Sequence, residues 1–196
     1  MSIYAFAIQP NNNAFSPIVF DKVIHEDYIN KLVEQATPLP TEKGSIVRND
    51  AQHETHSDIR NVTVRYLPVS DEFGWLYDMI SQYVNSANND YFKYNITGFM
   101  EGMQFLHYGD DIGGGHYNWH LDVGANIATR KLTVILQLSD PDEYEGCDTE
   151  VMFNNNVDKR KGAITIFPSW LPHRVTQLTK GNRNALVAWV NGPTFR

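Results

Sequence analysis

Short β-type runs occupy most of the chain from about residue 91 onward, and this pattern restricts the fold more than any other feature. The runs are rich in β-branched and aromatic residues, and Gly, Asn, Asp and Pro separate them. They cover residues 92–97, 102–108, 131–139, 150–153, 163–169 and 185–190. Short strands at close spacing, divided by turn-forming residues, are typical of an antiparallel sandwich or barrel.

Two amphipathic helices are predicted ahead of these strands. Residues 25–36 repeat apolar side chains at helical spacing and carry acidic residues in the first turn, where the helix dipole favours them. Residues 75–88 also gather apolar side chains on one helical face. Between the helices, residues 37–58 are polar and rich in turn formers, so we expect a long loop, followed by a strand-like run at 61–68. This order predicts an α+β, mainly β fold in which two helices buttress a β-sandwich.

The composition predicts one domain spanning residues 1–196. The chain has 196 residues, 42% of them hydrophobic, and its ten Phe, ten Tyr and four Trp allow a substantial core. Its formal net charge of −7 at pH 7 disfavours nucleic acid and anionic lipid surfaces as main partners. Because Cys147 is the only cysteine, an intramolecular disulfide and a cysteine-based zinc cluster are both excluded.

Neither an export signal nor a membrane span is visible in the sequence. The segment MSIYAFAIQPNNN lacks the basic start and the long apolar run of a signal peptide. No later stretch approaches the ~20 apolar residues that a membrane span requires. We therefore expect a cytoplasmic protein without a membrane partner.

Three His-x-Asp pairs are candidates for metal binding, because on a strand residues i and i+2 point to the same side and can hold one ion. His25 and Asp27 lie at the predicted start of the first helix, where a capping role is the simpler interpretation. His56 and Asp58 lie in the predicted loop beside His53. A solvated polar loop is the simpler interpretation there, with metal capture or a substrate contact as alternatives.

The third pair, His120 and Asp122, follows a glycine-rich turn and precedes a long predicted core strand. A third ligand is expected from a distant strand, and His173 supplies it from a Pro-bounded turn after the run 163–169. Two His and one Asp form the 2-His-1-carboxylate facial triad, which binds Fe(II) and leaves a face open for substrate, cosubstrate or oxygen. A structural zinc site would normally add a fourth protein ligand, and none is obvious in the sequence.

Arg183 is the candidate anchor for an anionic ligand at this open site. It stands ten positions after His173, at the entry of the last predicted strand, where a guanidinium can bind a carboxylate through two hydrogen bonds. By strand alternation Trp189 points to the same side as Arg183, with core packing as its alternative role. Tyr108, on the mixed polar face of the run 102–108, could donate its hydroxyl to the same carboxylate.

These motifs resemble the 2-oxoglutarate and Fe(II)-dependent oxygenases of the prolyl 4-hydroxylase-like type, and within them the PKHD-type hydroxylases of bacteria and phages. The resemblance covers nearly the whole chain, from about residue 19 to residue 193, and its pieces follow the family's order. They are QFLHY, YNWHLD, RKLTVILQLSD, YEG, AITIFPSWLPHRV and KGNRNALVAW. One departure is visible. Where the family tends to show Gly-Gly, this chain has Cys147 and Asp148 after Gly146, which puts the geometry of that turn in question.

The resemblance implies a double-stranded β-helix, or jelly-roll, core. It also implies that Fe(II) is held by His120, Asp122 and His173. The C5 carboxylate of 2-oxoglutarate would bind Arg183, with Tyr108 and Trp189 alongside. The implied activity couples oxidative decarboxylation of 2-oxoglutarate by O2 to hydroxylation of a C–H bond, with ascorbate as a candidate reductant. The leading substrate hypothesis is a prolyl or other aliphatic centre in a peptide or protein.

Two further functions stay open at this level. The same chemistry could act on a nucleobase or a free small molecule, although the acidic charge and the lack of a Lys/Arg-rich groove argue against nucleic acid. A non-catalytic jelly roll that holds metal structurally, or senses oxygen or 2-oxoglutarate, would bind metal without turning over 2-oxoglutarate.

Three smaller predictions concern the surroundings of the triad. Residues 40–60, which include Arg60, form the candidate lid over the substrate. His116 is not needed to complete the triad, and a contact to the site is its alternative role. Trp119 alternates to the strand face opposite His120, where we expect it to pack in the core.

Overall fold

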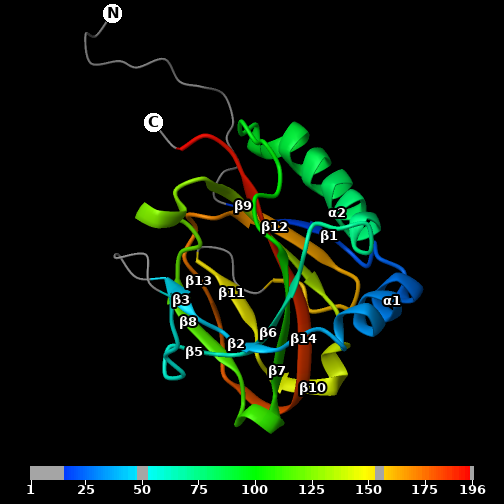
Figure 1. Cartoon of the computed structure of the whole chain (residues 1–196), viewed down its shortest axis with the longest axis vertical. Helices are drawn as coiled ribbons and strands as arrows, with labels where there is room; N and C mark the ends of the chain where they lie inside the picture. The colour runs from blue at the N-terminus through cyan, green and yellow to red at the C-terminus, as the bar shows by residue number, and fades with distance from the viewer. Residues whose placement is uncertain (1–15, 48–52, 153–156, 195–196) are drawn as a thin grey trace, which may run out of the picture.

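A large antiparallel sheet runs through the molecule, and a smaller sheet lies beside it (Figure 1). The computed structural model describes residues 16–47, 53–152 and 157–194. The large sheet has the strand order β1-β12-β9-β14-β7-β6-β2, and β10 also pairs with β14. Its strands are β1 (Ile18–Phe20), β12 (Ile164–Pro168), β9 (Arg130–Gln137), β14 (Leu178–Asn191), β7 (Met103–Gly109), β6 (Thr63–Leu67), β2 (Glu42–Lys43) and β10 (Tyr144–Gly146).

The smaller sheet has the strand order β11-β13-β8-β5. Its strands are β11 (Thr149–Val151), β13 (His173–Val175), β8 (His116–His120) and β5 (Arg60–Asn61), and a separate pair consists of β3 (Ile46–Val47) and β4 (His53–Glu54). The strand pairings in all three sheets are antiparallel. The prediction of a mainly β, antiparallel fold with two helices is therefore confirmed.

Helices α1 (Glu26–Ala36) and α2 (Gly74–Ala87) pack on the face of the large sheet that points away from the smaller sheet (Figure 1). His25 is the N-cap of α1, and its Nδ1 accepts a hydrogen bond from the Asp27 backbone N–H at 3.3 Å, which confirms the capping interpretation of this pair. The apolar face of α1 is buried through Ile29 and Leu32. Helical segments within the described ranges are too short or too polar to cross a membrane.

Alternation along β14 divides the interior into two parts. Leu186, Ala188 and Val190 belong to the core between the large sheet and the helices. Val187 and Trp189 point the other way and line a cavity between the two sheets. The same strand thus stabilises the fold with one face and builds a site with the other.

The predicted strand at 92–97 is wrong. The chain forms a π-helical turn η1 (Asn88–Phe92) after α2, and only an isolated bridge between Gly98 and Asn191 follows it among the described residues. The reason is the Asn88 side chain, which donates to the Tyr94 carbonyl at 3.0 Å and accepts from the Tyr94 N–H at 2.9 Å. These two bonds satisfy Tyr94 locally, so its backbone does not need a strand partner.

The predicted loop at 37–58 is more ordered than its composition suggests. It contributes β2 to the large sheet and the paired strands β3 and β4, while residues 48–52 lie outside the described residues. Pairing with β6 determines this, because the Gly44 N–H donates to the Val62 carbonyl at 2.8 Å just beyond β2. Tertiary hydrogen bonds have therefore overridden a local turn composition.

The turn at Gly146 and Cys147, where the sequence departs from the family pattern, stays tight. Both residues have positive φ, 73° and 51°, and the Cys147 N–H donates to the Gln177 carbonyl at 3.2 Å. A Cβ on Gly146 would lie 2.2 Å from that same carbonyl oxygen, so the position requires glycine. The turn buries the Cys147 side chain completely inside the fold.

Candidate metal centre

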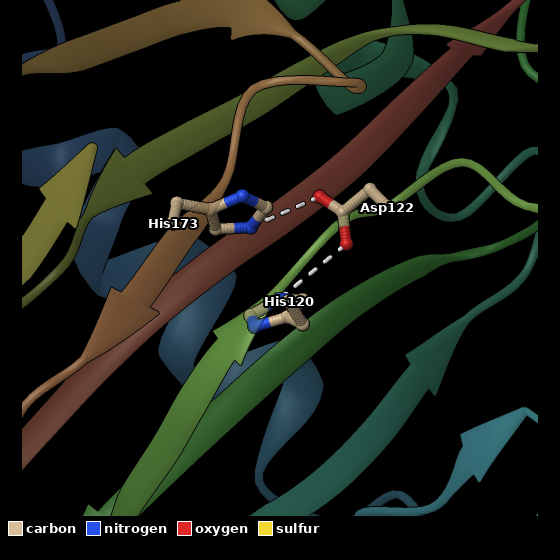
Figure 2. Close-up of side chains that lie close together, drawn as sticks. All are labelled: His120, Asp122 and His173. Atoms are coloured by element: carbon tan, nitrogen blue, oxygen red, sulfur yellow. Dashed lines mark ion pairs between the residues drawn. The ribbon is translucent and has the colours of Figure 1, made fainter. Parts of the chain in front are cut away.

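His120, Asp122 and His173 meet between the two sheets (Figure 2). His120 is the last residue of β8 and His173 the first residue of β13, and the two are direct partners across this strand pair. One ligand atom from each of the three residues lies within 4.8 Å of the others. Two imidazoles and a carboxylate are a donor set that suits Fe(II).

Asp122 reaches the site by a different route from the predicted one. The sequence argument placed it on the strand with His120, but β8 ends at His120 and Asp122 lies in the bend that follows. Its backbone N–H donates to the Ser169 carbonyl at 2.9 Å, which ties the bend to the loop before His173. The carboxylate therefore points inward because of a tertiary hydrogen bond rather than strand alternation.

Backbone carbonyls orient both imidazoles. His120 Nδ1 lies 2.7 Å from the Asn118 carbonyl, and His173 Nδ1 lies 2.9 Å from the Leu171 carbonyl. A carbonyl can only accept, so each Nδ1 carries a proton and each Nε2 is the nitrogen that faces the site. Both Nε2 atoms face the carboxylate, at 3.6 Å from Asp122 Oδ1 for His120 and 3.2 Å from Oδ2 for His173. The two Nδ1–carbonyl contacts thus orient the imidazoles so that Nε2 is the atom available to a metal ion.

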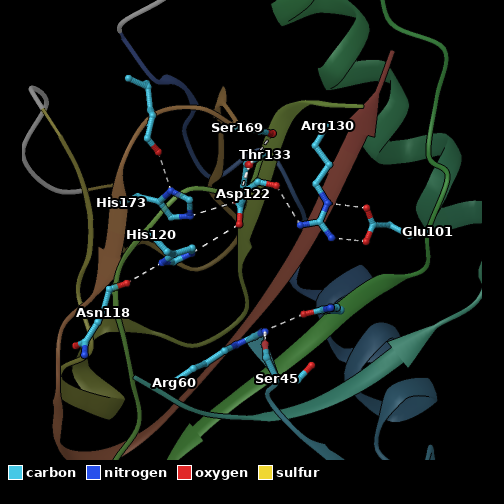
Figure 3. A network of polar contacts seen from close by, with 12 residues as sticks. Ser45, Arg60, Glu101, Asn118, His120, Asp122, Arg130, Thr133, Ser169 and His173 are labelled. Atoms are coloured by element: carbon cyan, nitrogen blue, oxygen red, sulfur yellow. Dashed lines mark hydrogen bonds and ion pairs between the residues drawn. The ribbon is translucent and has the colours of Figure 1, made fainter. Parts of the chain in front are cut away.

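The Asp122 carboxylate is buried and hydrogen-bonded (Figure 3). Thr133 Oγ1 donates to Asp122 Oδ2 at 2.7 Å, and the Ser169 hydroxyl lies 3.1 Å from the Thr133 oxygen. Burial opposes ionisation of Asp122, but the neighbouring His173 and His120 hold its pKa well below the usual range. The site therefore offers a negative charge at neutral pH.

His120 is neutral at physiological pH. Burial, and then the proximity of His173, lower the pKa of His120 to about 3. Its ring stacks on Tyr117 with 3.4 Å between the ring centroids. A neutral, packed imidazole is ready to bind a metal ion without first losing a proton.

Arg183 is a fully buried cation whose hydrogen-bond acceptors are all neutral. Its exposed fraction is 2%, and it donates from Nη2 to Gln137 Oε1 at 3.0 Å and to Thr149 Oγ1 at 3.1 Å. The thiol of Cys147 lies 3.8 Å from Nη1. Within the described ranges no carboxylate forms an ion pair with Arg183. Because an unpaired buried charge is costly, this arrangement fits an anionic ligand.

Tyr108 and Trp189, the other two predicted ligand-binding residues, both line the cavity that contains the triad. The Arg183 guanidinium lies 5.5 Å from the centroid of the Tyr108 ring. Burial raises the pKa of Tyr108 far above its usual value, so its hydroxyl stays a donor. Trp189 lies farther along β14, and the Arg130 guanidinium covers its ring at 3.7 Å from the centroid.

The cavity has a volume of about 340 Å³ and an apolar wall on the side of the large sheet. Leu106, Ile135 and Val187 form part of this wall, and Val175 faces it from the smaller sheet. An enclosed apolar wall next to a charged centre excludes water and leaves orientation to a few polar groups.

His56 and His116, which the sequence also singled out, have hydrogen-bond partners outside the triad. His56 Nε2 lies 2.7 Å from Glu54 Oε2, and His116 Nε2 lies 3.2 Å from the Asp58 carbonyl. The side chain of His53 lies outside the described part of the structure. His56 and His116 are not among the described residues that line the cavity, so the triad remains the candidate for chemistry, with Arg183 bonded to the lining residue Thr149.

The prediction that Trp119 packs in the core is wrong. Alternation does turn it away from His120, but the outer face of the small sheet is open, and 46% of Trp119 is exposed. The Arg174 guanidinium lies 5.0 Å from the centroid of its ring. The alternation rule gave the direction of the side chain and could not tell which sheet face is covered.

Several cavity residues were missed by sequence reasoning, and most carry no local signal. Gln137 and Thr149 hold Arg183, while Glu101 and Arg130 form a bidentate pair beside Asp122 (Figure 3). Arg130 also donates to the Asp122 carbonyl at 3.2 Å. The one available indication was Gln137 at the end of β9, a polar residue that stands between Leu136 and Leu138.

Comparisons with known proteins place this arrangement in context. Residues 103–191 match the family model described as the 2OG-Fe(II) oxygenase superfamily. A PKHD-type hydroxylase from Teredinibacter turnerae is 34% identical over 86 residues, which are 39% of this chain and 38% of that protein. Another from Prochlorococcus marinus is 38% identical over 82 residues, 39% of this chain and 37% of that protein. The matches therefore span less than half the length of these curated relatives.

Solved structures share the fold over most of the chain. A prolyl hydroxylase from Trichoplax adhaerens, in complex with a peptide fragment of the hypoxia inducible factor oxygen degradation domain, has a TM-score of 0.74 at 16% identity. The match covers 92% of this chain and 85% of that one. A prolyl-4-hydroxylase from Pseudomonas putida has a TM-score of 0.67 at 16% identity, covering 90% and 92% of the two chains. These similarities confirm the predicted jelly-roll fold.

Proposed function

Over residues 103–191 this chain belongs to the 2OG-Fe(II) oxygenase superfamily, and from that premise we propose that it hydroxylates a C–H bond of a prolyl or other aliphatic residue in a peptide or protein. The observation that carries the proposal is a cavity that contains a facial-triad donor set and whose lining residue Thr149 accepts a hydrogen bond from Arg183, a buried arginine that lacks an anionic partner in the described ranges. The PKHD-type relatives and the prolyl hydroxylase structures support it as similar proteins.

The donor chemistry fits both implied groups. Two imidazole Nε2 atoms and one ionised carboxylate suit Fe(II) through His120, Asp122 and His173. The Arg183 guanidinium, with Thr149 and Tyr108 beside it, suits the distal carboxylate of 2-oxoglutarate. When bound, Fe(II) and 2-oxoglutarate would activate O2 as the oxidant, with one oxygen atom going to succinate as CO2 is lost and the other going to the substrate C–H bond.

The chain's own residues bind, orient and exclude water. The carbonyls of Asn118 and Leu171 fix the imidazoles, and Thr133 fixes the carboxylate, so the open face of the triad has one orientation. Gln137 and Thr149 hold the guanidinium in place before any ligand arrives. This preorganisation lowers the free-energy cost of orienting the cosubstrate.

The test is an anaerobic titration of the Fe(II)-loaded protein with 2-oxoglutarate, followed through the visible charge-transfer band that keto-acid chelation produces. We expect the band in wild type, its loss in Asp122→Ala, and an apparent affinity weakened about 10- to 100-fold in Arg183→Met, since one charge-assisted contact is lost. Arg174→Met is the matched control, because Arg174 pairs with Glu150 and does not line the cavity. A folded, iron-loaded protein without the band would support a non-catalytic jelly roll instead.

A further inference from the structure

Arg60 lines the cavity together with Arg130, and it holds neither the metal ligands nor Arg183 in place. It lies in β5 and reaches the cavity from the side of the small sheet, below His120 in Figure 3. Its guanidinium lies 4.9 Å from the centroid of the Tyr117 ring, and Tyr117 in turn stacks on His120. One aromatic ring therefore links Arg60 to a candidate metal ligand.

The hydrogen bonds of Arg60 hold it in place without neutralising it. Nη1 donates to the Ser45 carbonyl at 2.7 Å, and Nη2 donates to Gln104 Oε1 at 3.1 Å. Both acceptors are neutral, and a guanidinium has five N–H groups in total. Its Nε is buried and lacks a hydrogen-bond partner among the described residues. Within the same ranges no carboxylate forms an ion pair with Arg60.

Arg130 provides the contrast. It lines the same cavity, but its Nε lies 2.7 Å from Glu101 Oε1 and its Nη2 contacts the other oxygen of that carboxylate. The fold thus neutralises one cavity arginine with a bidentate carboxylate and leaves the other with neutral acceptors. Arg60 is positioned like a binding group, whereas Arg130 is positioned like a structural one.

The charges of the cavity leave room for one more anion. In the described lining the carboxylates are Glu101 and Asp122, and the guanidinium groups are Arg60 and Arg130, with Arg183 behind Thr149. Glu101 matches Arg130, and Asp122 matches the charge of Arg183. Fe(II) and the 2-oxoglutarate dianion cancel each other. The positive charge of the partly buried Arg60 stays unmatched in the described lining, so it attracts an anion.

We propose that Arg60 binds a carboxylate of the substrate, so that the enzyme hydroxylates a residue or amino acid bearing a carboxylate close to the reacting carbon. This inference rests on the proposed function and names its substrate class. A planar guanidinium matches a carboxylate through two parallel hydrogen bonds. The substrate is then an acidic side chain or a chain end with a free carboxylate, rather than an uncharged residue inside a polypeptide.

The experiment measures binding without turnover. The protein is loaded anaerobically with Mn(II) and 2-oxoglutarate, and binding of small ligands is followed by the broadening of their proton resonances by Mn(II). The ligands form two matched pairs, N-acetylproline with N-acetylprolinamide and N-acetylglutamate α-amide with N-acetylglutamine α-amide. Within each pair only one negative charge differs.

We expect wild type to bind the acid of at least one pair about tenfold or more tightly than its amide, and Arg60→Gln to abolish this preference. Arg60→Lys keeps the positive charge but lacks the two parallel N–H donors of the guanidinium. This variant should keep part of the preference for the acid. Arg65→Gln is the matched control, because Arg65 of strand β6 lies over the ring of Phe105 in β7 and is not among the described residues that line the cavity. If Arg60→Gln does not fold, wild type still tests the inference, because an equal response to acid and amide overturns it.

Two results would overturn the inference. One is an equal response to acid and amide in both pairs with wild-type protein. The other is a loss of 2-oxoglutarate affinity in Arg60→Gln as large as that in Arg183→Met, with the acid preference unchanged, which would assign Arg60 to the cosubstrate. Both leave the charge-transfer band of wild type intact, whereas failure of the proposed function removes that band.

Discussion

The hydroxyl of Thr133 offers a sharp test of how the fold prepares the metal site. Thr133 is 1% exposed, and its Oγ1 donates to Asp122 Oδ2 at 2.7 Å. Thr133→Val keeps the shape of the side chain and removes this donor. A hydrogen bond to a charged group contributes about 1.5–3 kcal/mol. The Ser169 hydroxyl, 3.1 Å from Thr133 Oγ1, also loses a partner.

The expected result follows from these contacts. Supporting contacts of metal ligands typically account for ~10- to 100-fold in metal affinity. We therefore expect Mn(II), measured by calorimetry on the metal-free protein under anaerobic conditions, to bind Thr133→Val ~10- to 100-fold more weakly than wild type. Urea unfolding of the metal-free protein should show a loss of about 1.5–3 kcal/mol in the free energy of unfolding.

Thr165 provides the matched control. It is equally buried, at 1% exposed, in the neighbouring strand β12, but its Oγ1 has no hydrogen-bond partner among the described residues. Thr165→Val should therefore leave metal affinity unchanged and keep or raise stability, because an unsatisfied hydroxyl is removed. Unchanged affinity in Thr133→Val, or an equal loss in both variants, would refute the role of Thr133 as a support of Asp122.

Three further predictions follow from burial and close contacts. Burial raises the pKa of the Cys147 thiol, which is 0% exposed, so iodoacetamide at pH 8 should modify it only after unfolding; mass spectrometry showing rapid labelling of native protein would contradict this. Trp119→Ser should change the melting temperature by only a few degrees or less, since the side chain is 46% exposed, and a large drop would mean that its face is covered. Gly115→Ala should weaken 2-oxoglutarate binding in the charge-transfer titration, because the new Cβ would lie 2.6 Å from Tyr108 Cδ1, whereas Gly74→Ala, with nothing within 4 Å, should leave it unchanged.

Local sequence patterns determined a large part of this structure. Helical spacing fixed α1 and α2, because each must bury one apolar face against the sheet. Alternation fixed which side of β14 carries Trp189 and which carries Leu186. Such patterns depend only on the geometry of a single element, so they can be read without knowledge of its neighbours.

Only part of the candidate site could be predicted from local sequence patterns. The residue types of the triad and their spacing could be read from the chain, but the inward direction of Asp122 comes from the hydrogen bond of its N–H to the Ser169 carbonyl, 47 positions away in the sequence. The partners of Arg183 come from β9 and β11, and no local pattern links them to β14.

Tertiary structure alone decided which polar groups share the cavity and which surfaces are covered. Arg60 and Arg130 look alike in the sequence, yet among the described residues only Arg130 meets a carboxylate. Trp119 is 46% exposed on the outer side of the small sheet, where Arg174 lies over its ring. In each case chain segments far away in sequence form the environment of the side chain. That environment determines the free energy of a charge or of an apolar surface.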